Sequence, residues 1–282
     1  MRIFLFVLLF LQINHTTSQD SNFAYSTIPE ELLKNANAVI RLDEMKINVL
    51  ATNRMTYTVN QIVTVLNKKG NSYSRTRVGY DKEKRIKNLN VYVYDHSGVE
   101  IDHVKRKDFQ DLSASDGISL YNDSRLLYQK YTPISYPYTI SVSYTVETSD
   151  TGFFPSWYFL SDYRVSVQKS YFEILYASSD LKPDIKEFNL EDISVNKVDA
   201  QGKIVYEAEH MTAINSEAHS PSIRDIVPRL SSRMKKFNLK GEEAEVNNWK
   251  EMGAWVNNKL LRDRSVLSIE TVAKAKELVQ GM

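Results

Sequence analysis

The sequence contains no cysteine among its 282 residues. This absence excludes thiol nucleophiles, thiolate zinc sites, iron–sulfur clusters and disulfides from the chain. The sequence also has almost no net charge, because 36 Lys and Arg oppose 35 Asp and Glu. So even a balance gives no overall field that would attract nucleic acid, and we expect no nucleic-acid partner.

Glycine is scarce as well, and the nine glycines are scattered along the chain. Neither a Gly-rich phosphate-binding loop nor the G-x-S-x-G turn of α/β-hydrolases occurs. The sequence therefore predicts no nucleotide cofactor and no hydrolase serine. What is present is 42% hydrophobic residues with 11% aromatics, which predicts a folded domain with a sizeable core.

The amino-terminal residues have the layout of a secretory signal peptide. Arg2 is followed by an uninterrupted apolar run, Ile3–Leu11, and then by small polar side chains. We predict a signal at residues 1–19, cleaved near Ser18. A membrane anchor would need about 20 apolar residues, more than this run offers. We therefore expect an exported protein, periplasmic or extracellular, with no membrane span after cleavage.

Alternation of apolar and polar residues predicts a series of short β-strands after a flexible lead at 20–37. The run from Met55 to Val65 keeps its apolar side chains on one face and is interrupted only by Gln61. A change of parity between Val167 and Phe172 indicates a bulge or bend. The predicted strands cover 55–65, 89–94, 99–101, 138–147, 165–176 and 204–208, and the last of these is expected to end the series.

Many short strands without intervening helices predict a mainly-β fold, an antiparallel β-sandwich over residues 38–215. A proline-containing extended connector is predicted at 216–241, and two short helices at 242–282, the second capped by Ser268. Two such helices cannot bury their apolar residues, among them Trp255, on each other. We expect them to dock on the sandwich or on another domain.

Histidines and a calcium-like loop give no metal-site pattern. His96 and His103 lie at and near a predicted turn, where a solvated surface position is expected. The segment 111–117 resembles a calcium loop, but its glycine comes one position late and Asn122 stands where Glu is needed. We therefore predict a polar turn, no metal and no cofactor.

Carboxylates leave one enzymatic alternative open. Asp116, Asp123 and Glu217 could supply the acidic pair of a glycan hydrolase, but their spacing in sequence carries little weight. The sequence assigns no catalytic residue, and we expect a protein that is not an enzyme.

A cluster of aromatic residues surrounds Pro155. Large aromatic side chains are mostly buried, so the cluster is expected to cap one end of the sandwich. An exposed patch could instead stack on sugar rings or dock a partner, and Trp157 with Tyr158 is the candidate binding surface for a glycan or protein ligand. The cluster consists of Phe153, Phe154, Trp157, Tyr158 and Phe159.

Several stretches, in colinear order from about Ala38 to the end, together resemble one family. They are RLDEMKINVLATNRMTYTVNQIVTVLNKKG, DGISLYNDSRLLYQKY, YPYT at 136–139, FPSWY at 154–158, AINSEAHSPSIRDIVPRL and WKEMGAW at 249–255. The chain resembles the N-terminal domain of unknown function of exported bacterial transglutaminase-like proteins.

This resemblance implies a β-sandwich that precedes a papain-like transglutaminase core, whose Cys, His and Asp carry the chemistry. No catalytic residue belongs to the N-terminal domain in that family. The sequence ends about where the resemblance places the start of the core, as expected for a fragment, a split gene product or a stand-alone domain. The implied role is structural or binding, with a transglutaminase-like domain as partner in cis or in trans.

Overall fold

The computed structural model describes residues 23–114, 123–191, 193–262 and 266–280, so the predicted signal at 1–19 lies outside the described residues. The strands are β1 Ala38–Ala51, β2 Arg54–Val65, β3 Arg75–Tyr80, β4 Lys84–Tyr94, β5 Glu100–Lys105, β6 Gln110–Ser113, β7 Arg125–Lys130, β8 Tyr138–Thr148, β9 Trp157–Tyr158, β10 Val165–Tyr176, β11 Asp184–Phe188, β12 Val195–Ala200, β13 Lys203–Met211, β14 Arg229–Arg233, β15 Lys236–Leu239 and β16 Glu242–Glu245. The mainly-β prediction is confirmed.

Helical segments are short and lie mostly at the two ends of the chain. They are α1 Glu30–Leu33, α2 Ile223–Ile226, α3 Trp249–Trp255 with a π-helical continuation at Val256–Leu261, α4 Ile269–Val279, and 3₁₀ turns at Tyr25–Thr27, Lys68–Ser74, Arg106–Asp108 and Ser179–Leu181. The two predicted C-terminal helices are confirmed. No helix within the described ranges is long and apolar enough to cross a membrane.

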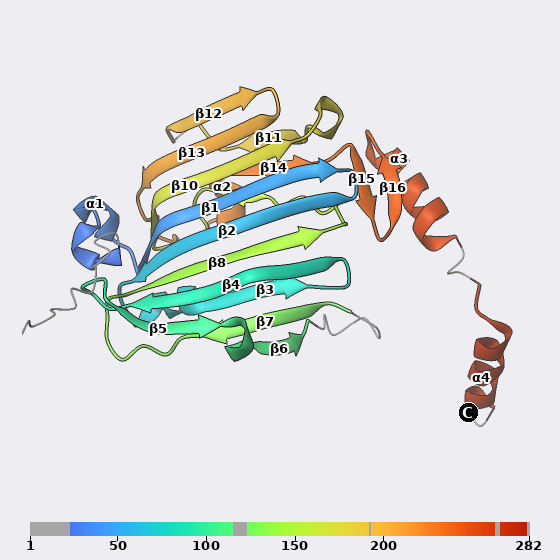
Figure 1. Ribbon diagram of the computed structural model, residues 1–282, viewed down its shortest axis with the longest axis horizontal. Coiled ribbons are helices and arrows are strands. Elements are labelled where there is room, and N and C mark those ends of the chain that lie inside the picture. Colours follow the sequence, from blue (N-terminus) through green and yellow to red (C-terminus); the bar gives the residue numbers. More distant parts are fainter. Residues whose placement is uncertain (1–22, 115–122, 192, 263–265, 281–282) are drawn as a thin grey trace, which may run out of the picture.

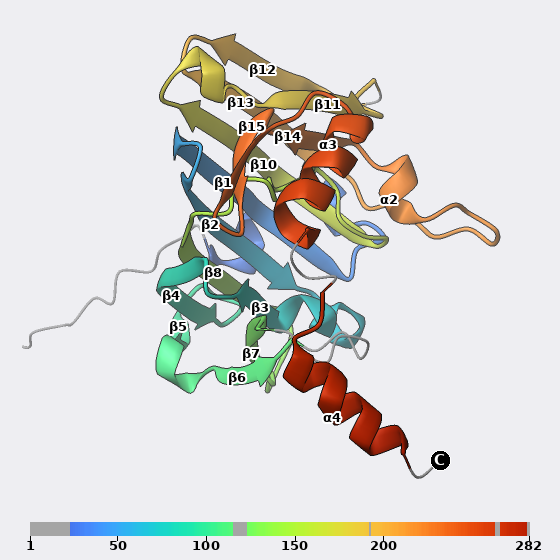
Figure 2. The same cartoon turned by 90° about the vertical axis from the view of Figure 1, so that its right-hand side faces the viewer.

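One large sheet of eight strands organises the molecule, in the order β12-β13-β10-β1-β2-β8-β4-β5 (Figure 1). Its strands pair antiparallel except for β1 and β10, which run parallel. Two three-stranded sheets, β11-β14-β9 and β3-β7-β6, lie on one side of it (Figure 2). We call the side of the large sheet that they cover the inner face.

Period-2 alternation explains the inner face. Met55, Val63 and Val146 point inward and are almost completely buried, and their neighbours in sequence point outward. The predicted parity change in β10 is also confirmed: Val167 pairs with Ile40 of β1, and the next inward positions are even-numbered. At the same level, β1 shows a register shift against β2 between Ile40 and Leu42.

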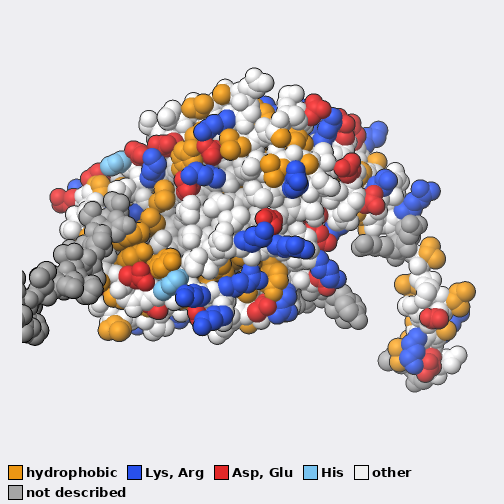
Figure 3. Space-filling model, viewed as in Figure 1, with side chains coloured by type: hydrophobic (Ala, Val, Ile, Leu, Met, Phe, Trp, Pro, Cys, Tyr) orange, Lys and Arg blue, Asp and Glu red, His pale blue; other side chains and the backbone are white. Residues whose placement is uncertain are grey.

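The outer face of the large sheet is polar and its charges are paired. Thr58 and Thr145 share a hydroxyl–hydroxyl hydrogen bond of 3.1 Å across β2 and β8. Asn60 donates to Glu44 at 2.7 Å, and Lys46 approaches the other carboxylate oxygen of Glu44 at 2.7 Å. Figure 3 shows this face with Lys and Arg scattered around an uncharged centre. It therefore presents no patch of one charge sign.

The amino-terminal lead differs from the prediction of a flexible segment at 20–37. From residue 23 onward it packs on one end of the sheet. The buried guanidinium of Arg41 donates to the carbonyl of Ala24, and Ser166 Oγ donates to the carbonyl of Leu32 at 2.6 Å. Leu32 is completely buried. A short apolar helix with such contacts is part of the fold.

The segment predicted as an extended connector, 216–241, also contains regular structure. It includes α2, then β14, which pairs with β11 and β9, and then β15, which pairs with β16. The strand at 204–208 is therefore not the last one. These later strands hold only four or five residues each, too short for alternation to reveal them.

The two C-terminal helices behave differently. Trp255 of α3 donates its indole N–H to the carbonyl of Glu243 at 2.9 Å and packs edge-on against Phe237. Helix α4 instead projects from the body (Figures 1 and 2). The expected docking on the sandwich therefore holds for α3 and is wrong for α4.

Candidate functional site

The predicted binding surface at Trp157 and Tyr158 does not form as an exposed pair. Trp157 is 5% exposed, stacks on Phe172 with ring centroids 5.3 Å apart, and donates its indole N–H to Ser170 Oγ at 3.0 Å. Tyr158 is partly buried. A sugar ring cannot stack on a buried indole, so Trp157 as an exposed binding residue is a correction. Of the cluster, Phe153 is the exposed member, at 62%.

The candidate carboxylates of a glycan hydrolase do not form a described site. Asp116 lies outside the described residues. Asp123 is exposed and pairs with Lys82 at 2.6 Å, and a hydrogen bond from Lys82 lowers the pKa of the Asp123 carboxyl. A general acid would need the opposite shift. Glu217 is exposed as well.

The histidines lie where a solvated surface was expected. His103 stacks on Tyr92 with centroids 4.1 Å apart and shares a 3.2 Å hydrogen bond with Asn90. His96 contacts the hydroxyl of Ser97 at 3.4 Å in the turn after β4. Across the described part of the chain, no three His, Asp or Glu side chains gather as a metal site requires.

The calcium-like segment 111–117 is described only through residue 114. Asp111 accepts hydrogen bonds from Tyr80 at 2.7 Å and from Arg125 at 2.9 Å. These two bonds, the tyrosine's first, lower the pKa of the Asp111 carboxyl. The carboxylate therefore joins β3, β6 and β7 to one another.

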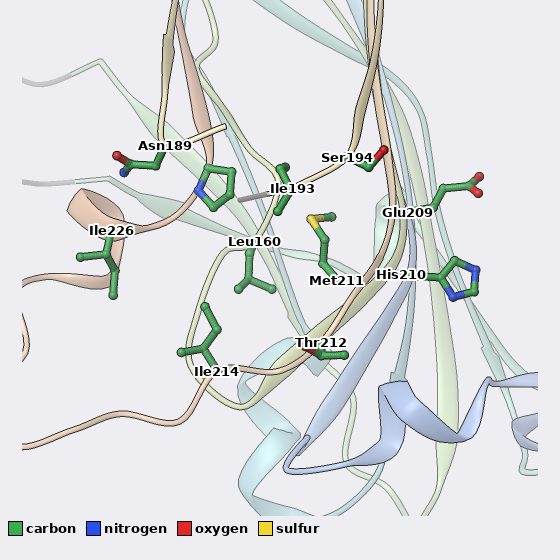
Figure 4. A pocket seen from close by; sticks show the side chains of 11 residues that line it. Leu160, Asn189, Ile193, Ser194, Glu209, His210, Met211, Thr212, Ile214 and Ile226 are labelled. Atoms are coloured by element: carbon green, nitrogen blue, oxygen red, sulfur yellow. The ribbon is translucent and has the colours of Figure 1, made fainter. Parts of the chain in front are cut away.

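A pocket of about 450 Å³ opens beside the start of β14 (Figure 4). Its lining is aliphatic toward the interior and polar at the rim. Leu160 and Met211 point into it, whereas Glu209 and His210 point away. Ile214 and Ile226 are each 40% exposed at its mouth. A concave apolar site of this size fits a small apolar group.

Two residues with left-handed backbone shape this pocket. His210 has φ +57° and Asn189 has φ +53°, conformations that cost energy in residues other than glycine. Asn189 is held by a hydrogen bond from its amide to the carbonyl of Asp225 at 2.8 Å. His210 shares a 3.1 Å contact with Glu31 of α1. The rim is therefore fixed by contacts from distant parts of the chain.

A second feature lies at the centre of the inner face. Here β1, β2 and β8 carry inward side chains that are only partly buried, although the positions beyond them are fully buried at Ile140 and Ile47. The strip lies between β10, which β9 covers through Trp157, and β4, which lies beside β3. We call it the central strip. Its members are Asp43, Met45, Tyr57, Gln61, Val142 and Tyr144.

Polar groups meet in this strip over an apolar floor. Gln61 donates its amide to one carboxylate oxygen of Asp43 at 3.1 Å. Burial raises the pKa of Asp43 to about 6, partly offset by that hydrogen bond. Burial likewise raises the pKa of Tyr57 to about 12, with a smaller effect of Asp81. For Tyr144 burial raises the pKa beyond the usual range, and the charges of Tyr57 and Asp43 add to it.

Sequence reasoning missed Asp43 as a candidate, although a signal was present. Gln61 was the one interruption of an apolar run in β2, and the register pairs it with Asp43. Polar residues at inward positions of neighbouring strands indicate a site, but only once the pairing is known.

The fold and these features define a mainly-β domain with one large sheet, two small covering sheets and no assigned chemistry. The chain matches the model of the DUF3857 family, a domain of unknown function with a solved structure, over residues 51–214. Because this match covers more than half of the chain, the chain belongs to that family. No curated protein matches the sequence.

Solved structures show the same kind of fold. A protein from Parabacteroides distasonis, provisionally named a protease, aligns with a TM-score of 0.56 at 16% identity, over 71% of this chain and 41% of that one. An M1 zinc metallopeptidase from Deinococcus radiodurans aligns with a TM-score of only 0.29 at 7% identity, over 73% of this chain and 46% of that one. The chain thus spans less than half the length of these structures.

Proposed function

We propose that this chain is an exported, non-catalytic accessory domain that precedes a transglutaminase-like, papain-like core. The observation that carries the proposal is helix α4. Ile269 is 89% exposed and Leu278 is 68% exposed, and both belong to a helix with no packing partner among the described residues. Short helices gain their stability mostly from packing. A second domain would supply that packing.

Two further observations support the same role. The motifs of the resemblance to transglutaminase-like proteins fall on β1, β2, β8 and α3 of the structure. The Parabacteroides distasonis neighbour is more than twice as long as the part that aligns, so a domain of this fold occurs there within a larger protein. A thiol for papain-like chemistry would come from the partner domain, since this chain has no cysteine.

The first test concerns catalysis. The purified chain is incubated with a fluorescent primary amine and a glutamine-containing protein substrate, and amine incorporation is measured. We expect none from this chain alone. Incorporation by the lone chain, abolished on unfolding, would contradict the proposal.

The second test concerns docking. The chain is joined to a transglutaminase-like core from a family member that carries both domains. We expect the amides of α4 to exchange with solvent more slowly in the joined protein than in the chain alone. The double variant Ile269→Gln, Leu278→Gln should abolish that slowing. Equal exchange in both proteins would argue against docking through α4.

A protein-binding role is the second candidate, and the pocket in Figure 4 favours it over glycan binding. The pocket is lined by aliphatic side chains rather than by rings that stack on sugars. We expect 8-anilinonaphthalene-1-sulfonate, an apolar probe, to gain fluorescence on binding there. Ile226→Asp should remove that gain, whereas the matched change at the 99%-exposed Ile134 should not. Equal fluorescence in the two variants would exclude this pocket.

A further inference from the structure

The central strip combines a carboxylate, two phenol hydroxyls and apolar side chains in one partly open place. We propose that it binds a primary alkylammonium group, such as the amine-bearing side chain of a lysine. This site is separate from the surface of α4 and does not depend on the accessory role proposed above.

Charge is the first argument. Within the described residues, Asp43 has no Lys, Arg or His partner at ion-pair distance, and its one hydrogen bond comes from Gln61. A carboxylate withdrawn from water without a cation is costly. Most other acidic side chains near the large sheet are paired, as Glu44 is with Lys46 and Glu173 with Lys203. A cationic ligand would complete Asp43 in the same way.

Hydrogen-bonding capacity is the second argument. The hydroxyls of Tyr57 and Tyr144 have no hydrogen-bond partner among the described residues, and they are not among the fully enclosed polar atoms. An ammonium group offers three N–H donors. The free oxygen of Asp43 and the two hydroxyls provide three acceptors.

The sheet register brings these acceptors together. Asp43 faces Gln61, and Gln61 faces Val142, in one row across β1, β2 and β8. Tyr144 belongs to the next inward row and Tyr57 to the row after that. Neighbouring strands are about 4.8 Å apart and successive inward rows about 7 Å, which long tyrosine side chains can span.

The shape of the site favours ammonium over guanidinium. A guanidinium group binds best when both carboxylate oxygens accept from its planar fork. One oxygen of Asp43 already accepts from Gln61, so a single oxygen is left. A compact ammonium needs only that. Met45 and Val142 can cover its methylene stem, and the tyrosine rings offer faces that attract cations.

The test uses two sources of the same group. The probes are the tripeptide acetyl-Gly-Lys-Gly-amide and 1,5-diaminopentane, and binding to the full chain is measured by ligand-observed NMR at pH 7.5. The matched neutral control replaces lysine by norleucine in the peptide. We expect the lysine peptide to bind at least tenfold more tightly than the norleucine peptide. A preference between peptide and free diamine would identify which source the site takes.

Substitutions then locate the site. Asp43→Asn should weaken binding of the lysine peptide about tenfold or more, and Tyr144→Phe should weaken it about threefold. The controls Asp123→Asn and Tyr80→Phe change an exposed carboxylate and a different tyrosine and should leave binding unchanged. Tyr144→Phe keeps the test valid if Asp43→Asn disturbs folding, which circular dichroism reports.

Measuring at pH 5 adds an independent readout. The groups that face Asp43 are Gln61, Tyr57 and Tyr144, none of which titrates near pH 5. Protonation of Asp43 should weaken binding about tenfold there relative to pH 7.5. No detectable binding, equal binding of lysine and norleucine peptides, or full binding by Asp43→Asn would each overturn the proposal.

Discussion

Asp43 is the residue where burial and charge conflict most. Its pKa is raised to about 6 by burial, from 3.8 in the unfolded chain. As pH rises from 4 to 6, the unfolded state loses its proton first while the folded state keeps it. The folded state therefore binds more protons in this window, and stability falls as pH rises.

We expect Asp43→Asn to remove this loss. At pH 7.5 the variant should be more stable than the parent by on the order of 2 kcal/mol, and at pH 3.5 the two should be nearly equal. Urea denaturation at several pH values measures this, with the exposed Asp123→Asn as control. A stability difference that does not change between pH 3.5 and 7.5 would show that Asp43 titrates normally.

Trp157 illustrates a residue whose importance is structural. Its indole fills the core over Phe172 and satisfies the buried hydroxyl of Ser170. Trp157→Phe should leave that hydroxyl unpaired and open a small cavity, at a cost of about 2 kcal/mol in the free energy of unfolding. The exposed Phe153→Leu should change it by no more than about 0.5 kcal/mol. Similar losses from both would place Trp157 outside the core.

At the scale of elements, the two C-terminal helices have the same kind of cap but different surroundings. Asn248 accepts from the N–H of Glu251 at the start of α3, and Ser268 accepts from the N–H of Thr271 at the start of α4. Either cap contributes about 1 kcal/mol to its helix. Because α3 packs through Trp255 and α4 does not, the consequences of removing each cap should differ.

We expect Ser268→Ala to speed hydrogen exchange in α4 without changing the melting temperature of the β-domain. Asn248→Ala should speed exchange in α3 and also weaken the edge-on packing of Trp255 on Phe237. Hydrogen exchange followed by mass spectrometry separates the two helices. A lower melting temperature in Ser268→Ala would mean that α4 packs on the domain.

The elements that could be predicted from sequence are those with long, regular alternation. The strand β8 and the hairpin of β4 and β5 follow directly from period 2 and from the turn residues at 95–98. Strands β9 and β14 hold two and five residues, and their pairing joins segments about 70 residues apart. No local pattern encodes such a pairing, because tertiary packing decides it.

The candidate site was harder to predict than the fold. The aromatic cluster at 153–159 was the visible signal, yet the structure turns Trp157 into the core. The central strip depends on three strands, of which β2 and β8 are about 70 residues apart in sequence, and on which part of their inner face the small sheets leave uncovered. That depends on layer packing, which alternation within one strand does not determine.

At the scale of the whole molecule, Lys240 ties the C-terminal hairpin β15–β16 to the large sheet. Its ammonium lies 2.6 Å from Glu83, 3.6 Å from Asp81 and 3.5 Å from Asp150. Asp150 is only 1% exposed. Removing the cation would leave a buried carboxylate without its ion-pair partner.

We expect Lys240→Met to lower the free energy of unfolding by about 2 kcal/mol and to loosen β15 and β16 first. The control Lys274→Met removes an exposed pair with Glu277 on α4 and should cost no more than about 0.5 kcal/mol. Chemical denaturation gives the free energies, and proteolysis near the hairpin reports loosening. An unchanged stability in Lys240→Met would mean that water, rather than Lys240, compensates Asp150.

The parallel pairing of β1 with β10 has a consequence for the newly made chain. β1 ends at residue 51 and β10 begins at residue 165, so one edge of β1 stays without its neighbour until the intervening segment has been synthesised. That edge belongs to a strand whose first residues, Ala38 to Ile40, are completely apolar. An unpaired apolar edge invites pairing with other chains. A holding chaperone during synthesis would therefore serve this protein until about its one hundred and seventy-sixth residue, where β10 ends.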